Sequence, residues 1–451
     1  MKTNSNFKII PGRLPAALVV AFVVGAGAAG RVEGAPPGEA EAVAAVGAEE
    51  AEQIDLEELE RRIEVLAAEL EQLRSGETGR VELGEAEARA LGLAPSAAAL
   101  YRQKRGVSIA GYGEMLYENF ASEDESGAAT GGGARADFLR AILYAGYRFS
   151  DRFLFNSEIE VEHADEIFVE FAYVDFLVND ALALRGGMVL LPMGLVNEFH
   201  EPNVFIGAKR PETEQAIIPS TWRENGFGVH GSKGRLAYRA YVVNGLRGSA
   251  FGAGGVRGGR QKGSAALADD LAFSARLDVT PTPGVFFGAS LYTGGSGQGE
   301  VALDGRDLQV GTTIFDLHGQ AQIRGFDLRG LYARASIDDA ADLNAALELS
   351  GSSGVAETME GFYLQVGYNV LSRVAGTKVS LLPYYRYEKV DTQKTMPAGF
   401  VRSRSTKRTL NTLGVEVKPL PSVVLKLDYQ LVSNDAGTGR NQLNVNLGYA
   451  F

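Results

Sequence analysis

Charged side chains of both signs gather between residues 192 and 225, in a stretch that lacks the alternation of a strand. Carboxylates, cationic groups and an imidazole held close together could select ions by charge, hold an anion or ligate a metal. The candidate residues are Glu198, His200, Glu201, Lys209, Arg210, Glu212, Glu214, Arg223 and Glu224. Apolar anchors such as Phe199, Phe205 and Trp222 predict that the stretch packs inward and presents its charges to an internal passage. An ordinary surface loop is the alternative.

The sequence gives little evidence for a catalytic site or a metal site. Glu198, His200 and Glu201 have no second histidine at ligand spacing, and Ser220 has no base beside it. A glycine-rich run at 252–259 lacks the Lys-Ser/Thr of a phosphate-binding loop. The chain has no Cys, which excludes disulfides and thiolate sites. We therefore expect no enzyme, no metal and no cofactor.

Short segments with apolar and polar residues in alternation fill the chain from residue 106 onward. Because side chains of a strand point to opposite faces in turn, each segment predicts a strand with one apolar and one polar face. The segments are 107–120, 137–149, 153–163, 167–178, 182–191, 226–233, 235–245, 271–279, 284–293, 310–323, 326–337, 359–370, 378–390, 406–418, 423–433 and 443–451. These are about 16 strands, the size of a porin barrel.

The connections between these strands alternate in length. Short turns are expected at 150–152, 280–284 and 419–421, and long polar or glycine-rich loops at 121–135, 247–268, 294–309, 338–356 and 391–405, with a short helix at 338–349. Short turns at one end and long loops at the other are typical of an outer-membrane barrel. A closed barrel also satisfies every backbone group in lipid and leaves no open edge.

The polar faces of the predicted strands carry charge, which suits a water-filled lumen better than the dry core of a soluble sandwich or propeller. The expected lumen-wall residues are Arg140, Glu158, Glu160, Glu162, Arg239, Arg276, Arg334, Arg386 and Arg408. The fold class is therefore all-β, an antiparallel transmembrane barrel over 106–451. Its closing strand ends on Phe451, and a terminal aromatic after such alternation predicts recognition by the barrel-assembly machinery.

The first hundred residues predict an exported chain with a periplasmic extension. Lys2, Lys8 and Arg13 precede a short apolar run, so residues 1–35 are expected to be a signal peptide. Residues 36–105 are expected to hold a heptad helix at 54–74 and a linker. The heptad positions are Leu56, Leu59, Ile63, Leu66, Leu70 and Leu73. Such a seam predicts self-association, and a helix packed on its own domain is the alternative.

Two stretches carry a family resemblance. Residues 194–231, with Asn-Glu-Phe-His-Glu-Pro and Ile-Ile-Pro-Ser-Thr-Trp-Arg-Glu-Asn-Gly, and residues 106–114 resemble the phosphate-selective porin O and P family. Related dicarboxylate porins share the heptad helix before the barrel. The resemblance implies a homotrimer of 16-stranded barrels with inward-folded loops. Members of the family have a lumenal arginine ladder and a lysine cluster, and the acidic row at 158, 160 and 162 departs from that pattern.

The sequence thus predicts a general or weakly anion-preferring outer-membrane porin that passes small hydrophilic solutes, phosphate or carboxylates among them, by diffusion. The alternative is an adhesin or tethering protein in which the barrel serves only as an anchor. The net charge of -12 implies no basic surface for nucleic acid. The expected partners are lipid, the solutes and other copies of the chain.

Overall fold

The computed structural model describes residues 85–179 and 181–451. The described residues belong to one compact unit. The predicted signal peptide at 1–35 and the heptad helix at 54–74 lie outside the described residues. No helix in the described part of the chain is long and apolar enough to cross a membrane.

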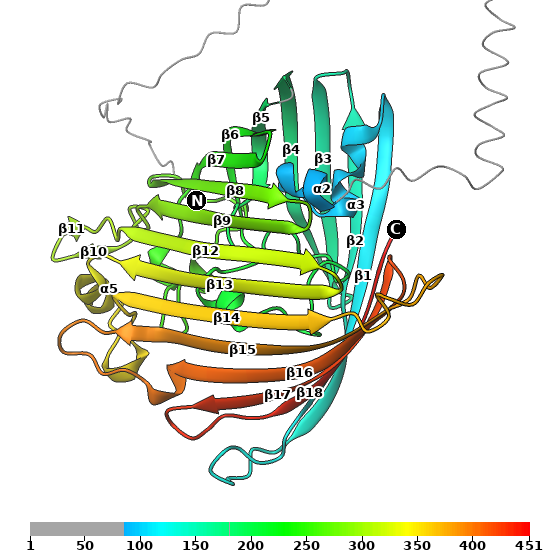
Figure 1. The fold of residues 1–451 in the computed structure, drawn as a ribbon. Helices are drawn as coiled ribbons and strands as arrows, with labels where there is room; N and C mark the ends of the chain where they lie inside the picture. The colour runs from blue at the N-terminus through cyan, green and yellow to red at the C-terminus, as the bar shows by residue number, and fades with distance from the viewer. Residues whose placement is uncertain (1–84, 180) are drawn as a thin grey trace, which may run out of the picture. The chain divides into compact units, whose positions relative to one another are not determined.

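Sixteen antiparallel strands close into a barrel, which confirms the predicted fold class and strand number (Figure 1). The barrel strands are β1 (Gly106–Phe120), β2 (Gly133–Arg148), β3 (Phe153–Glu162), β4 (Glu166–Asn179), β5 (Leu182–Leu190), β6 (Arg223–Lys233), β7 (Leu236–Asn244), β8 (Leu271–Thr282), β9 (Val285–Gly294), β12 (Thr312–Ile323), β13 (Phe326–Ile337), β14 (Thr358–Tyr368), β15 (Ser380–Thr395), β16 (Lys407–Leu420), β17 (Val423–Asn434) and β18 (Gln442–Ala450). Strands β10 (Ala302–Leu303) and β11 (Arg306–Asp307) form a separate hairpin within a loop.

The barrel closes where the first strand meets the last. Strand β1 pairs with β18, and the red end of the chain lies beside the cyan strand in Figure 1. Beyond the last strand, Gly111 and Phe451 exchange two backbone hydrogen bonds of 2.8 Å. Phe451 therefore extends the closing ladder by one residue.

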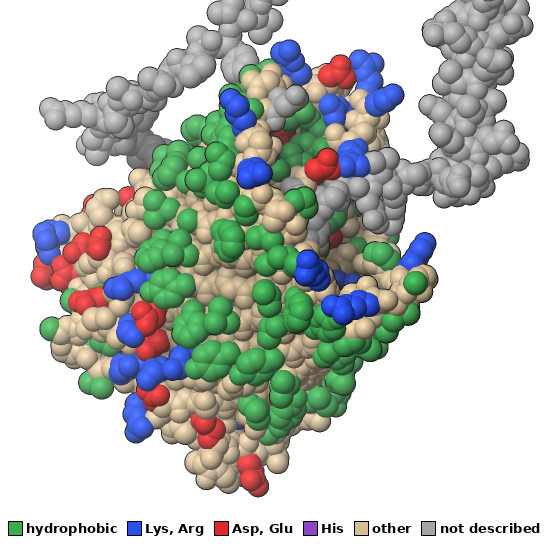
Figure 2. Space-filling model, in the orientation of Figure 1, with side chains coloured by type: hydrophobic (Ala, Val, Ile, Leu, Met, Phe, Trp, Pro, Cys, Tyr) green, Lys and Arg blue, Asp and Glu red, His purple; other side chains and the backbone are tan. Residues whose placement is uncertain are grey.

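The two faces of the strands differ as the alternation predicts. Outward residues such as Ile167, Phe227 and Leu364 are more than 60% exposed, whereas inward residues such as Glu158 are fully buried. Figure 2 shows the hydrophobic side chains gathered over the strands, with most charged side chains toward the strand ends. This apolar outer face suits contact with lipid.

Long and short connections fall at opposite ends of the barrel. One end carries the β2–β3, β6–β7, β8–β9, β12–β13 and β16–β17 turns. The other carries long connections, including 191–222 after β5 and 245–270 after β7. Residues 163–165 are a short exception at the long-loop end, and 369–379 are a longer one at the short-turn end. The predicted loop helix is α5 (Ala340–Ala346).

Residues 85–102 lie inside the short-turn end of the barrel, which corrects the expectation of a linker up to residue 105. They form α2 (Glu85–Ala90), α3 (Pro95–Ala98) and the 3-10 turn η1 (Ala99–Arg102). The Nδ2 of Asn156 donates to the Ala97 carbonyl over 3.1 Å, and Nη1 of Arg239 donates to the Arg89 carbonyl over 2.8 Å. Leu93 and Leu100 are almost fully buried. The helices have only six and four residues, which is too short for a periodic pattern of apolar residues that would predict them.

Arg334 faces outward, which corrects its assignment to the lumen wall. On β13 the inward residues near the long-loop end are Leu331, Ala333, Ala335 and Ile337, all buried. They belong to an apolar cluster with residues of the loop that follows, among them Leu343 of α5. Because this part of the interior is filled with protein, its inner face is apolar and the charged residue lies on the other face.

Candidate functional site

The segment 191–222 begins and ends at one point of the barrel wall. The Leu191 amide donates to the Trp222 carbonyl over 3.0 Å. The Asn197 side chain bonds both ends of the segment. Its Nδ2 donates to the Leu191 carbonyl over 2.7 Å and to the Trp222 carbonyl over 3.0 Å, while its Oδ1 accepts from the Trp222 amide over 2.6 Å. The segment, called the inward loop below, is thus closed at its neck. Arg223 and Glu224 belong to β6 rather than to the loop.

From this neck the inward loop reaches the opposite wall. Strand β15 is eight strands from β5 in either direction around the barrel. Arg386 of β15 donates to the Ile206 carbonyl over 3.4 Å, and Glu388 of the same strand accepts from the Thr213 amide over 2.5 Å. On β17, Lys426 Nζ donates to the Phe205 carbonyl over 2.8 Å. The loop therefore spans the lumen and narrows it.

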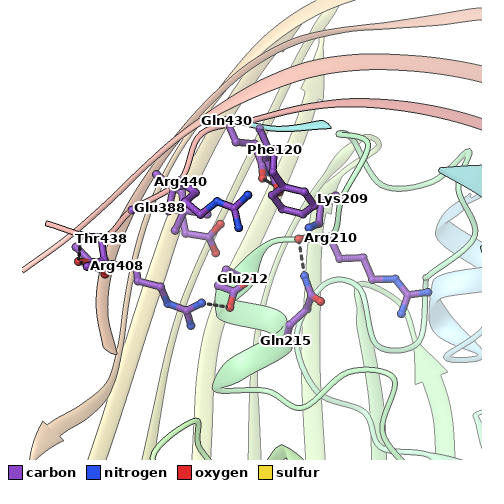
Figure 3. Close-up of a pocket in the computed structure, with 15 residues that line it drawn as sticks. Phe120, Lys209, Arg210, Glu212, Gln215, Glu388, Arg408, Gln430, Thr438 and Arg440 are labelled. Carbon is purple, nitrogen blue, oxygen red and sulfur yellow. Dashed lines mark hydrogen bonds and ion pairs between the residues drawn. The ribbon is translucent and has the colours of Figure 1, made fainter. Parts of the chain in front are cut away.

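A cavity of about 310 Å³ lies where the inward loop meets the far wall at the long-loop end (Figure 3). Its charged lining residues are Lys209, Arg210, Glu212, Glu388, Arg408 and Arg440. We call this the mouth cavity. Four cationic residues face two carboxylates there, so its lining carries an excess of positive charge.

Ion pairs hold the walls of the mouth cavity in place. Nη1 of Arg408 lies 2.6 Å from Glu212 Oε1, as the dashed line in Figure 3 shows. Lys209 Nζ lies 2.8 Å from Glu118 Oε1 on β1. Nη2 of Arg440 donates to the Ala121 carbonyl over 3.3 Å. Three guanidinium nitrogens of the lining have no hydrogen-bond partner among the described residues: Arg210 Nη2, Arg408 Nε and Arg440 Nε.

Several residues predicted for the constriction lie elsewhere, paired with the β3–β8 wall or with the N-terminal segment. Glu198 Oε1 lies 3.1 Å from Arg239 Nε, and its Oε2 lies 3.8 Å from Arg276 Nη1. Both arginines also pair with Asp278 at 2.8 Å. Glu201 accepts from the Ser96 amide and hydroxyl, each over 3.1 Å. Glu198 thus secures the loop to the wall and Glu201 secures it to the N-terminal segment, and neither lines the mouth cavity.

A second wall cluster surrounds His200. Its Nε2 lies 3.1 Å from Glu158 Oε1 and 3.1 Å from Glu170 Oε2. Arg223 Nη1 lies 2.9 Å from the other oxygen of Glu170. Nearby, the predicted wall residue Arg140 pairs with Glu114, Glu160 and Glu162 at 3.2, 3.3 and 3.7 Å.

The remaining two predicted carboxylates bond to backbone and uncharged side chains. Glu214 Oε2 accepts from the Leu195 and Val196 amides over 2.8 and 2.6 Å, and its Oε1 bonds the Tyr363 hydroxyl over 2.6 Å. Burial raises the pKa of Glu214 to about 7, although these hydrogen bonds favour the charged form. Glu224 accepts from Asn244 Nδ2 over 2.7 Å. Their role is to hold the loop in shape.

Two charged residues of the mouth cavity, Glu388 and Arg440, were not predicted, and neither was Glu118, the ion-pair partner of Lys209. Glu118 and Glu388 lie on the polar faces of β1 and β15, so the alternation could have identified them. Arg440 lies in the connection before β18, and its approach to Phe120 depends on how the barrel closes. The sequence contains no local sign of that contact.

Comparisons with known proteins define the family and the fold. No family model matches the sequence. A protein of Aquifex aeolicus (strain VF5), described only as an uncharacterized protein, is 39% identical over 356 residues, which cover 75% of this chain and 78% of the relative.

Among solved structures, Salmonella typhi OmpF in complex with daunomycin is similar with a TM-score of 0.52 and 10% identity, over 77% of this chain and 98% of OmpF. The outer membrane channel DcaP of Acinetobacter baumannii gives a TM-score of 0.48 and 12% identity, over 76% of this chain and 97% of DcaP. The likeness to OmpF shows a general porin fold. The chain belongs to the same family as the Aquifex aeolicus protein.

Proposed function

We propose that this protein is an outer-membrane channel through which small hydrophilic solutes diffuse passively. The observation that carries the proposal is the inward loop, which crosses from β5 to β15 and leaves the mouth cavity beside the far wall. The apolar outer face supports insertion in a bilayer, and the porin fold supports conduction. No chemical step, cofactor or energy source belongs to this proposal.

Within this function we propose a preference for anions. The mouth cavity has two more cationic than acidic side chains in its lining, and three of its guanidinium nitrogens lack a hydrogen-bond partner among the described residues. Guanidinium groups suit carboxylate and phosphate oxygens. The resemblance to the phosphate-selective porins agrees with a preference for anions. The acidic residues of β3 would repel anions and so weaken this preference.

Planar-bilayer recording in a salt gradient tests both parts of the proposal. The full-length protein should produce stepwise conductance, with a reversal potential of the sign that anion permeation gives. A reversal potential near zero or of the opposite sign would remove the anion preference and leave the channel. Protein that inserts and never conducts would remove the channel itself.

The second candidate is a barrel that only anchors a periplasmic segment. The insertion of residues 85–102 into the short-turn end favours it, because Asn156 and Arg239 hold the segment against the wall. Absence of conductance, together with retention of the barrel in the membrane, would support this function.

We also propose that the chain forms homotrimers. The heptad pattern of 56–73 and the family resemblance support this state. Chemical cross-linking of the full chain in detergent, compared with a chain lacking residues 54–74, tests the role of the helix. Equal trimer content in both would assign the assembly to the barrel alone.

A further inference from the structure

One histidine nitrogen faces two carboxylates inside the barrel. His200 comes from the inward loop, Glu158 from β3 and Glu170 from β4. The Nε2 of the histidine lies 3.1 Å from an oxygen of each glutamate. All three side chains are at most 2% exposed. One ligand atom from each residue lies within 4.8 Å of the other two.

A β-bulge directs Glu170 into this group. The ladder between β3 and β4 passes from Glu158–Phe171 to Ile159–Val169, so Glu170 is the extra residue without a partner. Glu170 and its neighbour Phe171 are both buried, although regular alternation would expose one of them. A bulge can re-aim a side chain in this way, and it is often found beside functional sites.

Hydrogen bonds among the described residues do not satisfy every polar atom of these three side chains. The Nδ1 of His200 lies 2.9 Å from the Asn197 carbonyl, so it carries a proton and donates it. Without a bound ion, Nε2 must carry a proton as well, because a lone pair there would face two carboxylate oxygens, and a metal ion would take the place of this proton. Glu158 Oε2 has no hydrogen-bond partner among the described residues, although its residue is fully buried. An N–H donor to the backbone on one nitrogen and a free lone pair on the other is the usual state of a metal-bound histidine.

Another buried histidine shows the contrast. In His318, Nδ1 lies 2.6 Å from Asp316 and Nε2 lies 2.9 Å from Asp278, so each nitrogen faces one carboxylate. Ordinary hydrogen bonds account for that geometry. At His200 a single N–H would have to serve two carboxylates.

The charge around His200 favours a cation. The neighbouring carboxylates are Glu114, Glu158, Glu160 and Glu170. Two arginines, Arg140 and Arg223, pair with members of this set. Four carboxylates thus face two arginines and one histidine in a buried place, and a metal ion bound in place of the histidine proton would add positive charge among them.

We propose that His200, Glu158 and Glu170 bind a divalent transition-metal ion, for which Zn²⁺ serves as the probe. Tetrahedral Zn²⁺ with ligands at about 2.0 Å places its donor atoms about 3.3 Å apart. The two separations of 3.1 Å from His200 Nε2 to the glutamate oxygens come within a few tenths of an ångström of that spacing. The ion would fasten the inward loop to β3 and β4, and its fourth position would take water. This site is independent of whether the barrel conducts.

Metal analysis of the full-length protein tests the site. Protein folded in detergent is stripped with a chelator, incubated with Zn²⁺ and desalted, and its zinc content is measured. We expect about one Zn²⁺ per wild-type chain. We expect His200→Gln and Glu158→Gln each to weaken Zn²⁺ binding by about 100-fold or more. The matched control is His318→Gln, which removes a buried histidine that also contacts two carboxylates and should keep the zinc.

Heat-modifiable gel mobility identifies variants that do not fold. If His200→Gln fails to fold, Glu158→Gln and the wild type decide the question. Replacing Zn²⁺ with Co²⁺ adds a spectroscopic readout, because histidine and carboxylate ligands around Co²⁺ give visible absorption bands. The proposal is overturned if the folded wild type binds no Zn²⁺, which would leave an imidazolium between two carboxylates. Zinc retained in folded His200→Gln or Glu158→Gln would overturn it as well.

Discussion

Arg408 of β16 and Glu212 of the inward loop form an ion pair of 2.6 Å across the mouth cavity. The two residues come from opposite sides of the lumen, since the loop leaves the wall at β5. Each is a little under one third exposed. The pair therefore lies at the boundary between the packed interior and the open end, where a charge change acts on ions more than on folding.

Reversing the charge of Arg408 should lower the preference for anions. Arg408→Glu places a carboxylate beside Glu212 and removes one of four cations from the lining of the mouth cavity. We expect the anion-to-cation permeability ratio to fall by about twofold or more. The reversal potential in a KCl gradient measures this ratio. Arg404→Glu, with the same charge change at an exposed position of the neighbouring loop, is the control and should change the ratio much less.

Removing the Asn197 side chain should loosen the inward loop. Asn197→Ala leaves the Leu191 carbonyl and both backbone groups of Trp222 without this partner inside the barrel. We expect a loss of about 2–4 kcal/mol in the free energy of unfolding, measured by guanidinium titration in lipid vesicles. In Asn203→Ala the lost side-chain oxygen has no hydrogen-bond partner among the described residues, so its effect should be small. Equal losses in the two variants would contradict the proposed closure at the neck.

Stability should fall as the pH rises from about 4.5 to 7, and Glu214 should contribute to the fall. Its pKa is raised to about 7 in the folded chain, so the folded state holds a proton that the unfolded state releases above its ordinary pKa of 4.5. The stabilisation that protonated Glu214 contributes is fully present below pH 4.5 and is lost between pH 4.5 and 7. Over that range the free energy of unfolding falls by at most about 1.4 kcal/mol per pH unit from this residue. Glu214→Gln mimics the protonated acid, so the fall in stability across this window should become shallower in the variant. An unchanged pH dependence would contradict the raised pKa.

A side chain at Gly146 should displace the N-terminal segment from the wall. A Cβ at Gly146 would come within 2.6 Å of the Leu100 side chain, which packs against β2. Gly146→Ala should therefore speed trypsin cleavage at the exposed residues Lys104 and Arg105 by several-fold. In Gly186→Ala the new Cβ would lie 3.9 Å from its nearest neighbour, and cleavage should stay at the wild-type rate. Identical rates in all three proteins would mean that residues 85–102 do not need this contact.

The strands could be predicted from the sequence because the alternation of apolar and polar residues along each strand is visible within about ten consecutive residues. The prediction of which face of a strand a residue lies on was wrong where a neighbouring segment or a bulge determines that face. Arg334 lies outside because the loop with Leu343 fills the interior beside its strand. Glu170 lies inside because a bulge interrupts the alternation. The insertion of 85–102 depends on long-range contacts such as Arg239 with the Arg89 carbonyl, which no spacing within helices of six and four residues reveals.

The sequence predicts which residues the candidate site contains better than it predicts where each of them lies. The sequence marks 192–225 as charged and irregular, and the structure brings Lys209, Arg210 and Glu212 together at the mouth cavity. It pairs Glu198 with arginines of the wall instead, and Glu201 with the Ser96 amide of the N-terminal segment. Pairing across the barrel depends on which strands face each other, and the sequence alone does not show this.

Single-channel conductance of a loop-deleted chain tests the central claim, that the inward loop constricts a conducting lumen. In a variant lacking residues 198–215, Asn197 still joins Leu191 to Trp222, while the contacts with Arg386, Glu388 and Lys426 are lost. We predict conductance at least about twofold above that of the wild type in the same salt. An unchanged conductance in folded, inserted protein would contradict the constriction.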